Sequence, residues 1–575
     1  MSAFDLKFTS NALSDELSDT SLLLPLSDPS STARAQDVVA AAQADYARLI
    51  SVMYDRGFFA PQVSILINGR EAALLSPVRP IDQIRTVEVR VSTGPAFKFG
   101  RARIAPVPQN AGLPDAFISG ETATTRILKD TVEAGVTSWR ALGYAKAGLA
   151  SQSITARHGA ARLDADIQLD PGPQLRFGSL RVSGNTRMRS ARIAEIAGLP
   201  KDKIFDPEEV DRAGTRLRRS GVFASISLTE AENISLNDRL DIEAQVTESK
   251  PRRFGFGAEL STQEGLGLSG FWLHRNLLGG GERLRLGAEI MGIGGTTGGT
   301  DYELTLAFSR PATFGSDTDF FTNAVISSLN EPNFSSDRVS IEAGVHRYAT
   351  PEREYSLGVG YTAANTMDTF GTRSYRILTL PLSAEFDYRD DDLNATKGYY
   401  AKASLTPFLN LRGTTNGARG FIDTRAYRSL GADKRMTFAV RGQLGFVAGP
   451  SLRNAPADLL FYSGGGGTVR GHNYQSLGVD QGNWNTIGGA SFIGLSGEVR
   501  VKTGEKLSVV GFYDTGFVGS KVVPRNRSGN WHSGAGLGVR YDTGIGPIRF
   551  DVAAPVGTPL RAKNVKLYIG IGQSF

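Results

Sequence analysis

Few side chains of this 575-residue chain are of the types and spacing that carry out catalysis. It has no cysteine, which excludes a thiol nucleophile, a thiolate metal site and a disulfide framework. None of its five histidines has the H-E-x-x-H or paired-ligand spacing of a zinc site. The segment 494–497 (GLSG) lacks the G-x-S-x-G spacing of a nucleophile elbow. We therefore predict no enzyme, no metal site and no cofactor.

Two further segments resemble ligand sites only at first sight. The four glycines 464–467 are not followed by the G-K-[ST] of a phosphate-binding loop, so they indicate the base of a flexible loop. The acidic run 387–394 (DYRDDDLN) has Arg389 at the third position of an EF-hand frame, where an oxygen ligand is required. We interpret this run as a strand end followed by a short turn.

Composition divides the chain near residue 250. Of its 67 glycines, 51 lie in residues 251–575, and the net charge of +6 belongs to that part as well. Lys and Arg are scattered rather than clustered, so we expect no nucleic-acid partner. No window is long and apolar enough for a transmembrane helix, and residues 1–5 lack the features of a signal peptide. The chain is therefore either soluble or a β-barrel whose export signal has been removed.

An internal repeat organises the first 250 residues. Residues 94–100 (GPAFKFG) return as 172–178 (GPQLRFG), 78 positions later. Residues 139–145 (WRALGYA) return as 217–223 (LRRSGVF) at the same spacing, and 46–59 contains an earlier copy. The pattern of each copy predicts a helix that ends at a glycine and is followed by a strand. We predict three tandem α+β modules, at 1–95, 96–174 and 175–250.

After residue 250 the hydrophobic pattern has a period of two. In the run 283–290 (RLRLGAEI), Leu284 and Leu286 share one face, and Arg283 and Arg285 share the other. Such long alternating runs are typical of membrane-crossing strands, of which only every second residue meets lipid. At about 20 residues per strand with its turn, residues 251–575 accommodate about 16 strands. We predict an all-β, 16-stranded antiparallel transmembrane barrel over 251–575, with Leu284 and Leu286 facing lipid.

The whole chain resembles the Omp85 superfamily, in which periplasmic POTRA modules precede an outer-membrane barrel. Residues 464–472 (GGGGTVRGH) are similar to the V-R-G-F/Y tip of the loop that folds into the barrel in that family. Residues 512–516 (FYDTG) match its F-x-D-x-G strand motif. Three modules, with the segments 275–283 and 538–551, look most like the TamA-type subunit of the translocation and assembly module. The resemblance implies a bacterial outer-membrane location, with POTRA modules in the periplasm.

The two motifs identify the candidate site. An Arg470 carried into the lumen by such a loop needs an acceptor, because a desolvated guanidinium without a partner is costly. Asp514, within an alternating strand, is the predicted partner, and Glu498 is a second acceptor. The alternative is that Arg470 is an exposed loop residue and Asp514 a turn residue. The remaining motif residues of this loop–lumen site are Val469, Gly471, His472, Phe512 and Gly516; His472 stands where the family has an aromatic residue.

A second candidate site is the closure of the barrel. We expect the first strand near 254–260, with Phe254, Phe256 and Gly257, and the last near 565–575, ending at Phe575. Gly570 and Gly572 interrupt the last strand and weaken it, so the two strands form a lateral seam that can open. The alternative is that these glycines only accommodate barrel curvature.

The resemblance and the modules lead to a function hypothesis. The modules would receive unfolded outer-membrane clients, of the autotransporter type, by strand addition at their sheet edges. The seam would then open within the lipid bilayer and aid client insertion or translocation. The alternative is a two-partner-type polypeptide secretion pore or a passive channel. The TamA resemblance also implies a TamB-like, inner-membrane-anchored partner.

Overall fold

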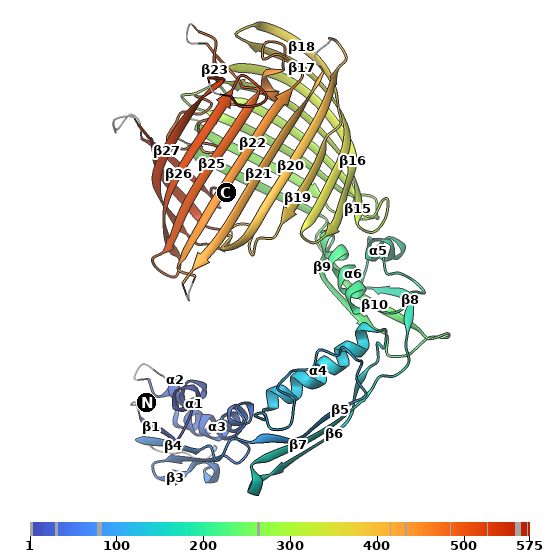
Figure 1. Ribbon diagram of the computed structural model, residues 1–575, viewed down its shortest axis with the longest axis vertical. Helices are drawn as coiled ribbons and strands as arrows, with labels where there is room; N and C mark the ends of the chain where they lie inside the picture. Colours follow the sequence, from blue (N-terminus) through green and yellow to red (C-terminus); the bar gives the residue numbers. More distant parts are fainter. Residues whose placement is uncertain are drawn as a thin grey trace. The chain divides into compact units, whose positions relative to one another are not determined.

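The computed structural model describes residues 4–28, 31, 33–76, 83–261, 265–413, 416–431, 434–482, 485–525, 527–544, 546–557, 565–571 and 573–575. These residues form two compact units. The first comprises Met1–Arg181, Pro200–Asp211 and Thr229–Ile242; the second comprises Val182–Leu199, Arg212–Leu228 and Glu243–Phe575. Figure 1 shows small mixed sheets with helices in the N-terminal part and a barrel in the C-terminal part.

The first sheet has the strand order β1-β4-β2-β3, with β1 parallel to β4. Its elements are β1 (Asp5–Ser10), α1 (Ser14–Thr20), α2 (Leu23–Leu26), α3 (Ala35–Asp55), β2 (Gln62–Ile67), β3 (Arg70–Glu71), η1 (Ala72–Leu74) and β4 (Thr86–Ser92). Helix α3 buries Val38, Ala42, Leu49 and Met53 in the core against the sheet. Their spacing of four or seven residues gives the helix one apolar face.

The second sheet has the order β5-β7-β6, so β6 is an edge strand. Its elements are β5 (Lys98–Ala105), α4 (Thr125–Ala141), β6 (Gly148–Arg157), η2 (His158–Ala160) and β7 (Arg162–Asp170). Strand β5 runs parallel to β7, and β6 runs antiparallel to it. The Thr124 hydroxyl caps α4 by accepting a hydrogen bond from the Ile127 N–H at 3.1 Å.

The third sheet has the order β8-β10-β9. Its elements are β8 (Arg176–Ser183), α5 (Ser190–Ala197), α6 (Pro207–Arg219), β9 (Phe223–Glu230) and β10 (Arg239–Glu248). The glycine that follows the repeated helix has a positive φ in all three copies, at Gly57, Gly143 and Gly221. Glycine adopts this left-handed conformation without a steric penalty, as the sequence pattern predicts.

The C-terminal unit contains a closed antiparallel barrel. Its first strands are β11 (Arg252–Ser261), β12 (Gly265–His274), β13 (Arg283–Ile293), β14 (Asp301–Arg310), β15 (Thr318–Glu331), β16 (Phe334–Thr350), β17 (Arg353–Asp368) and β18 (Gly371–Thr379). The others are β19 (Leu382–Asp387), β20 (Lys397–Asn410), β21 (Gly417–Leu430), β22 (Met436–Ala448), β25 (Ser491–Lys502), β26 (Leu507–Gly519), β27 (Gly529–Tyr541), β28 (Ile548–Pro555) and β29 (Lys566–Ile571).

Strands β18 and β19 occupy one position in the wall. Both pair with β17 on one side and with β20 on the other. The break falls at Leu380 and Pro381, because proline has no N–H to donate to a ladder. The ladder is nevertheless bridged there: the Leu380 N–H donates to the Pro407 carbonyl, and the Gly358 N–H donates to the Pro381 carbonyl. The 17 named segments therefore form 16 wall strands, which confirms the predicted fold class.

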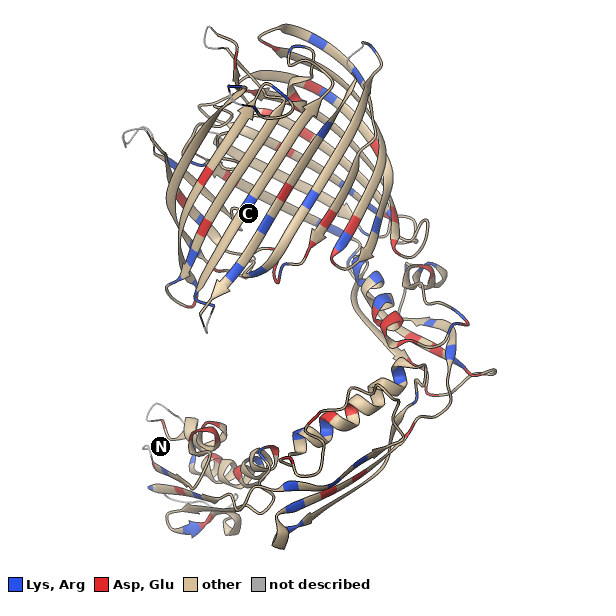
Figure 2. Ribbon diagram, viewed as in Figure 1, with Lys and Arg blue, Asp and Glu red and all other residues tan. Residues whose placement is uncertain are grey.

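The barrel wall has an apolar outer face. Leu304 of β14 lies opposite Ile326 of β15, which in turn lies opposite Val339 of β16, and all three side chains are more than half exposed. Leu286 belongs to the same face, whereas the Arg285 guanidinium lies over the Phe271 ring on the lumen face. Charged residues are scattered along the wall strands (Figure 2). Leu286 thus has the lipid-facing orientation that the alternation predicts.

None of the helices in the described residues combines the length and the apolar character needed to span a membrane.

The barrel closes through a short ladder between β11 and β29. Among the described residues, these strands pair only at Leu260 with Ile569 and at Ser261 with Tyr568. By comparison, β11 pairs with β12 along its whole length, from Arg252 to Ser261. Residues 252–259 of β11 therefore have a hydrogen-bonded neighbour on one side only, within the part of the chain that the structure describes.

Candidate functional site in the barrel lumen

A long loop connects β22 to β25 and enters the barrel. This lumen loop, residues 449–490, contains η3 (Ala457–Leu459), β23 (Val479–Asp480) and β24 (Thr486–Ile487). Its first half is held by β18 and β21, because the Tyr375 hydroxyl donates to the Ala455 carbonyl at 3.2 Å and Arg419 Nε donates to the Leu459 carbonyl at 3.0 Å. These contacts bring the tip of the loop, residues 468–472, to the opposite part of the wall.

The tip inserts Arg470 among three carboxylates. Its Nε and Nη2 donate to the two oxygens of Asp514 at 2.7 and 3.0 Å, and its backbone N–H donates to Asp514 Oδ2 at 3.2 Å. Its Nη1 donates to Glu498 Oε1 at 2.8 Å and to Asp551 Oδ2 at 3.2 Å. The guanidinium also lies 3.5 Å from the centroid of the Phe512 ring, and the side chain is 2% exposed. A buried cation with this many charge-assisted hydrogen bonds holds its loop in one position.

Two more arginines extend this cluster. Arg500 Nε donates to Glu498 Oε2 at 3.0 Å, and Arg540 Nη1 donates to Asp551 Oδ1. We call the six residues Arg470, Glu498, Arg500, Asp514, Arg540 and Asp551 the lumen network. All six are buried, and their formal charges, three positive and three negative, sum to zero. The pairing of opposite charges is what allows so many ionised groups to be buried together. At the edge of the network, Arg549 adds a longer contact to Asp551 Oδ2, at 3.9 Å.

The structure thus brings together the three charged residues that the sequence selects: Arg470 and Asp514 from the two motifs, and Glu498 from an alternating run. Sequence reasoning missed Asp551, Arg500 and Arg540. Each of these three is a charged residue within an alternating strand. Alternation places each of them on the lumen face, together with every second residue of its strand. That pattern is the one signal by which they could have been found.

The backbone of the tip also fits closely against the wall. The Gly471 N–H donates to the Tyr568 hydroxyl of β29 at 3.1 Å. Gly471 has a φ of +92°, and a Cβ at this position would lie 2.6 Å from the Ala554 carbonyl carbon of β28. A Cβ on Gly534 of β27 would overlap the Arg470 carbonyl oxygen. Glycine is therefore required on both sides of the contact.

The other motif residues surround the same contact. Val469 is fully buried, and a Cβ on Gly516 would lie 2.9 Å from its Cγ2 atom. His472 Nε2 is 2.8 Å from the Ser533 carbonyl oxygen, and its ring lies 4.2 Å from the ring of His532. In this chain His472 therefore contacts β27 through a ring pair and a hydrogen bond. With these contacts, the tip touches all of the last five wall strands.

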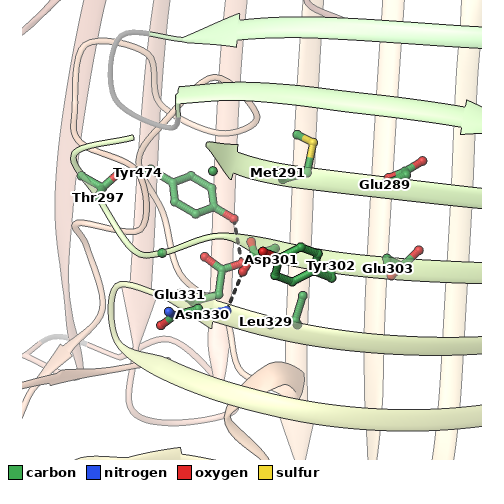
Figure 3. Close-up of a pocket in the computed structure, with 12 residues that line it drawn as sticks. Glu289, Met291, Thr297, Asp301, Tyr302, Glu303, Leu329, Asn330, Glu331 and Tyr474 are labelled. Carbon is green, nitrogen blue, oxygen red and sulfur yellow. Dashed lines mark hydrogen bonds between the residues drawn. The ribbon is translucent and has the colours of Figure 1, made fainter. Parts of the chain in front are cut away.

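The loop also contacts the wall on the side of β13, β14 and β15. The Tyr474 hydroxyl donates to Glu331 Oε1 at 3.3 Å, beside a cavity of about 240 Å³. Figure 3 shows Tyr474 and the carboxylates Glu289, Asp301 and Glu303 around this cavity. Within the described ranges, no group of three or more His, Asp or Glu side chains is arranged to hold a metal ion.

Residues predicted for the seam lie on both of the strands that close the barrel. Phe254, Phe256 and Gly257 lie on β11, in the part that pairs only with β12 among the described residues. Gly570 lies on β29 opposite Arg549 of β28, and a cavity of about 400 Å³ adjoins it. Gly572 lies outside the described residues.

The prediction that the last strand extends to Phe575 is wrong, because β29 ends at Ile571. Phe575 is buried with Ala395, Tyr427 and Ala439 of other parts of the barrel, and its main-chain oxygen accepts a hydrogen bond from Arg500 Nη2 at 3.1 Å. These contacts hold the residue away from the seam.

Helix α6 contacts the turn between β14 and β15. Arg216 donates through Nε and Nη2 to the two oxygens of Asp317 at 2.9 and 2.7 Å, and the Arg219 guanidinium lies 3.7 Å from the centroid of the Tyr348 ring. Burial alone would raise the pKa of the Asp317 carboxyl, but the hydrogen bonds and charges of Arg216 and Arg219 lower it below its usual value. The contact is thus an ionised pair at neutral pH.

A comparison with known protein families identifies the family of the barrel and of the module before it. A model described as the Omp85 superfamily domain matches residues 276–575, which is more than half of the chain. The chain belongs to the Omp85 superfamily. A POTRA model, described as a surface antigen variable number repeat, matches residues 175–249 of this Omp85 chain. Both findings confirm the family inferred from the tip and strand motifs.

The relatives of this Omp85 chain include BamA. This chain is 24% identical over 392 residues to the outer membrane protein assembly factor BamA of Nitratidesulfovibrio vulgaris. The match covers 65% of this chain and 48% of the relative. The chain thus spans about half the length of that protein. BamA of Haemophilus ducreyi lacking POTRA domains 1–3 has a similar structure, with a TM-score of 0.65 at 16% identity, over 83% of this chain and all of that one. CdiB of Acinetobacter baumannii gives a TM-score of 0.51 at 11% identity, over 94% of this chain and all of that one.

These similarities confirm the predicted location, the bacterial outer membrane, with the POTRA part in the periplasm. The closer likeness to the TamA-type subunit stays a prediction, as do the three module boundaries and the absence of enzymatic activity.

Proposed function

We propose that this protein assembles other proteins into the outer membrane. In this proposal the periplasmic modules bind unfolded clients, and the seam between β11 and β29 opens to aid their insertion. The observation that carries the proposal is the short seam, in which residues 252–259 of β11 lack a partner on the β29 side among the described residues. Lipid cannot satisfy free N–H and C=O groups, whereas an incoming client strand can pair with them.

The edge strand β6 is our candidate for client binding. It carries no charged residue before Arg157 and contains no proline, although edge strands are usually protected by such residues. Leu149 and Ile154 are exposed along it. An extended client segment would therefore add to this edge through main-chain hydrogen bonds.

The seam is tested by a disulfide. Leu260 and Ile569 are directly paired, so the variant Leu260→Cys/Ile569→Cys would lock the closure in a chain that has no other cysteine. Leu304→Cys/Ile326→Cys is the matched control, because it joins two paired outward residues of neighbours that stay together. We expect the seam disulfide to stop client insertion into proteoliposomes and the control disulfide to leave it unchanged. Normal insertion through the locked seam would refute lateral opening.

Proline substitution tests the edge strand. In an antiparallel edge strand, successive N–H groups point alternately toward the sheet and away from it. Of Gln152→Pro and Ser153→Pro, one therefore removes an outward donor and the other removes a donor to β7. We expect the outward variant to fold and to lose client crosslinking. Full crosslinking in that variant would exclude β6 as the binding edge.

We further propose autotransporter-type clients and a TamB-like inner-membrane-anchored partner, on the TamA resemblance. Co-purification from crosslinked envelopes tests both. Polypeptide secretion through the lumen is the competing outcome, and it predicts that a client reaches the exterior even when the Leu260–Ile569 disulfide is formed.

A further inference from the structure

The lumen network contacts a second segment besides the loop. This tail segment, residues 573–575, follows β29 and leaves the barrel wall. Arg500 Nη2 donates to the main-chain oxygen of Phe575 at 3.1 Å, and Arg540 Nε donates to Gln573 Oε1 at 3.0 Å. The Gln573 amide in turn donates to Asn394 Oδ1 at 2.9 Å. The tail segment is therefore held by two arginines that also belong to the network.

Each of two carboxylates is shared between the loop and the tail. Glu498 accepts from Arg470 through Oε1 and from Arg500 through Oε2. Asp551 accepts from Arg470 through Oδ2 and from Arg540 through Oδ1. Two parallel paths thus connect Arg470 of the loop to the tail segment, one through Glu498 and Arg500 and the other through Asp551 and Arg540.

Both tail arginines have a spare donor. Within the described residues, Arg500 Nη1 and Arg540 Nη2 are buried and have no hydrogen-bond partner. A buried donor without an acceptor is costly, so each arginine gains free energy by turning toward any carboxylate oxygen that becomes available. Withdrawal of Arg470 leaves Glu498 Oε1 and Asp551 Oδ2 without their hydrogen bonds to Arg470; Asp551 Oδ2 then keeps only the longer contact to Arg549 Nε, at 3.9 Å.

We propose that docking of the lumen loop and retention of the tail segment are coupled through Glu498 and Asp551, with Arg500 and Arg540 as positioning residues. When the loop leaves, the two arginines turn to the freed carboxylate oxygens and release Phe575 and Gln573. When the tail leaves, the same arginines compete with Arg470 for the carboxylates and loosen the loop. A coupling free energy acts equally in both directions. The use of this coupling to open the seam rests on the proposed insertion function, but the coupling itself requires no client.

Cysteine labelling measures the coupling without any client. The chain has no native cysteine, so Ser574→Cys reports on the tail segment and Gly467→Cys reports on the loop. A Cβ at Gly467 meets no atom within 4 Å, so this probe does not disturb the loop. The rate of maleimide labelling is measured on the full chain in proteoliposomes.

We expect Arg470→Ala to speed labelling of Ser574→Cys by about fivefold or more, the lower end of typical coupling between sites. Arg441→Ala is the matched control, because Arg441 donates to the Gly467 carbonyl of the same loop but pairs with Asp423, outside the network. That variant should leave tail labelling unchanged. Faster labelling of Gly467→Cys in Arg470→Ala without faster labelling of Ser574→Cys would overturn the proposal.

The reverse experiment covers the case in which Arg470→Ala does not fold. Gln573→Ala removes an acceptor of Arg540 and leaves every network residue in place. We expect it to speed labelling of Gly467→Cys. Unchanged loop labelling while the tail is released would also overturn the coupling, and neither result bears on whether clients are inserted.

Discussion

Reversal of the charge at Arg470 gives the sharpest test of the docked loop. In the wild type, the six network groups carry three positive and three negative charges. Arg470→Glu changes this balance to two positive and four negative charges, a net charge of −2 in a buried site. Loss of one partner from a buried ion pair costs about 3–5 kcal/mol. At about 1.4 kcal/mol per tenfold change, the docked loop should become about 10² to 4 × 10³ times less favoured relative to the free loop.

A second substitution should restore part of this loss. Arg470→Glu/Asp514→Arg returns the six groups to a net charge of zero. Asp514 accepts three of the five hydrogen bonds that Arg470 donates, so its replacement recovers the strongest single pairing but not the contacts to Glu498 and Asp551. The double variant should therefore lie between the wild type and Arg470→Glu.

Two measurements separate docking from function. Conductance in planar bilayers reports how often the loop leaves the lumen, and client insertion into proteoliposomes reports activity. Arg525→Glu is the control, because it makes the same change of charge in the exposed turn between β26 and β27. We expect high conductance and poor insertion for Arg470→Glu alone. Equal behaviour of Arg470→Glu and Arg525→Glu would refute the role of the network.

Three other substitutions test separate parts of the structure. Gly471→Ala should undock the tip as Arg470→Glu does, because of its positive φ and the close Ala554 backbone, whereas Gly467→Ala should not; conductance distinguishes them. Leu286→Arg should lower the free energy of unfolding in liposomes by about 2–4 kcal/mol if that residue lies near the bilayer midplane, and Arg285→Gln on the lumen face should change it little. Since the pKa of Asp317 is lowered, its pairing with α6 should persist at neutral pH and be lost only as the pH falls through that lowered pKa, under the ordinary range of an aspartate. Hydrogen exchange of α6 measures this loss, and Asp317→Asn should show the acid-state exchange at every pH.

The sequence predicts the strands of the wall better than the contacts inside it. Alternation is a local property, so a run such as 283–290 identifies both the strand and its lipid-facing residues. The break at Pro381 within one wall strand was not predicted, because the paired strands on both sides compensate for it. Such compensation depends on neighbours that are distant in sequence.

The lumen network shows the same limit. Arg470 and Asp514 were selected through motifs, and Glu498 from an alternating run. Asp551 of β28 and Arg540 of β27 were not selected, and it is the register of these strands that brings Asp551 to Arg470 and Arg540 to Asp551. The position of Phe575 likewise depends on Arg500, 75 residues earlier. Alternation places these side chains on the lumen face, but it does not indicate which of them contact one another or the loop.

The order of the contacts along the chain has a consequence for folding. Ala455 and Leu459, early in the lumen loop, are held by strands that precede it, β18 and β21, whereas its tip is held by β25 to β29, all of which follow it. Closing such long-range contacts is slow, and the tip cannot find its partners until the last hairpins exist. Docking of the tip is therefore a late event in barrel formation. A barrel that lacks its final strands should keep a protease-sensitive loop, so loop protection marks a completed wall.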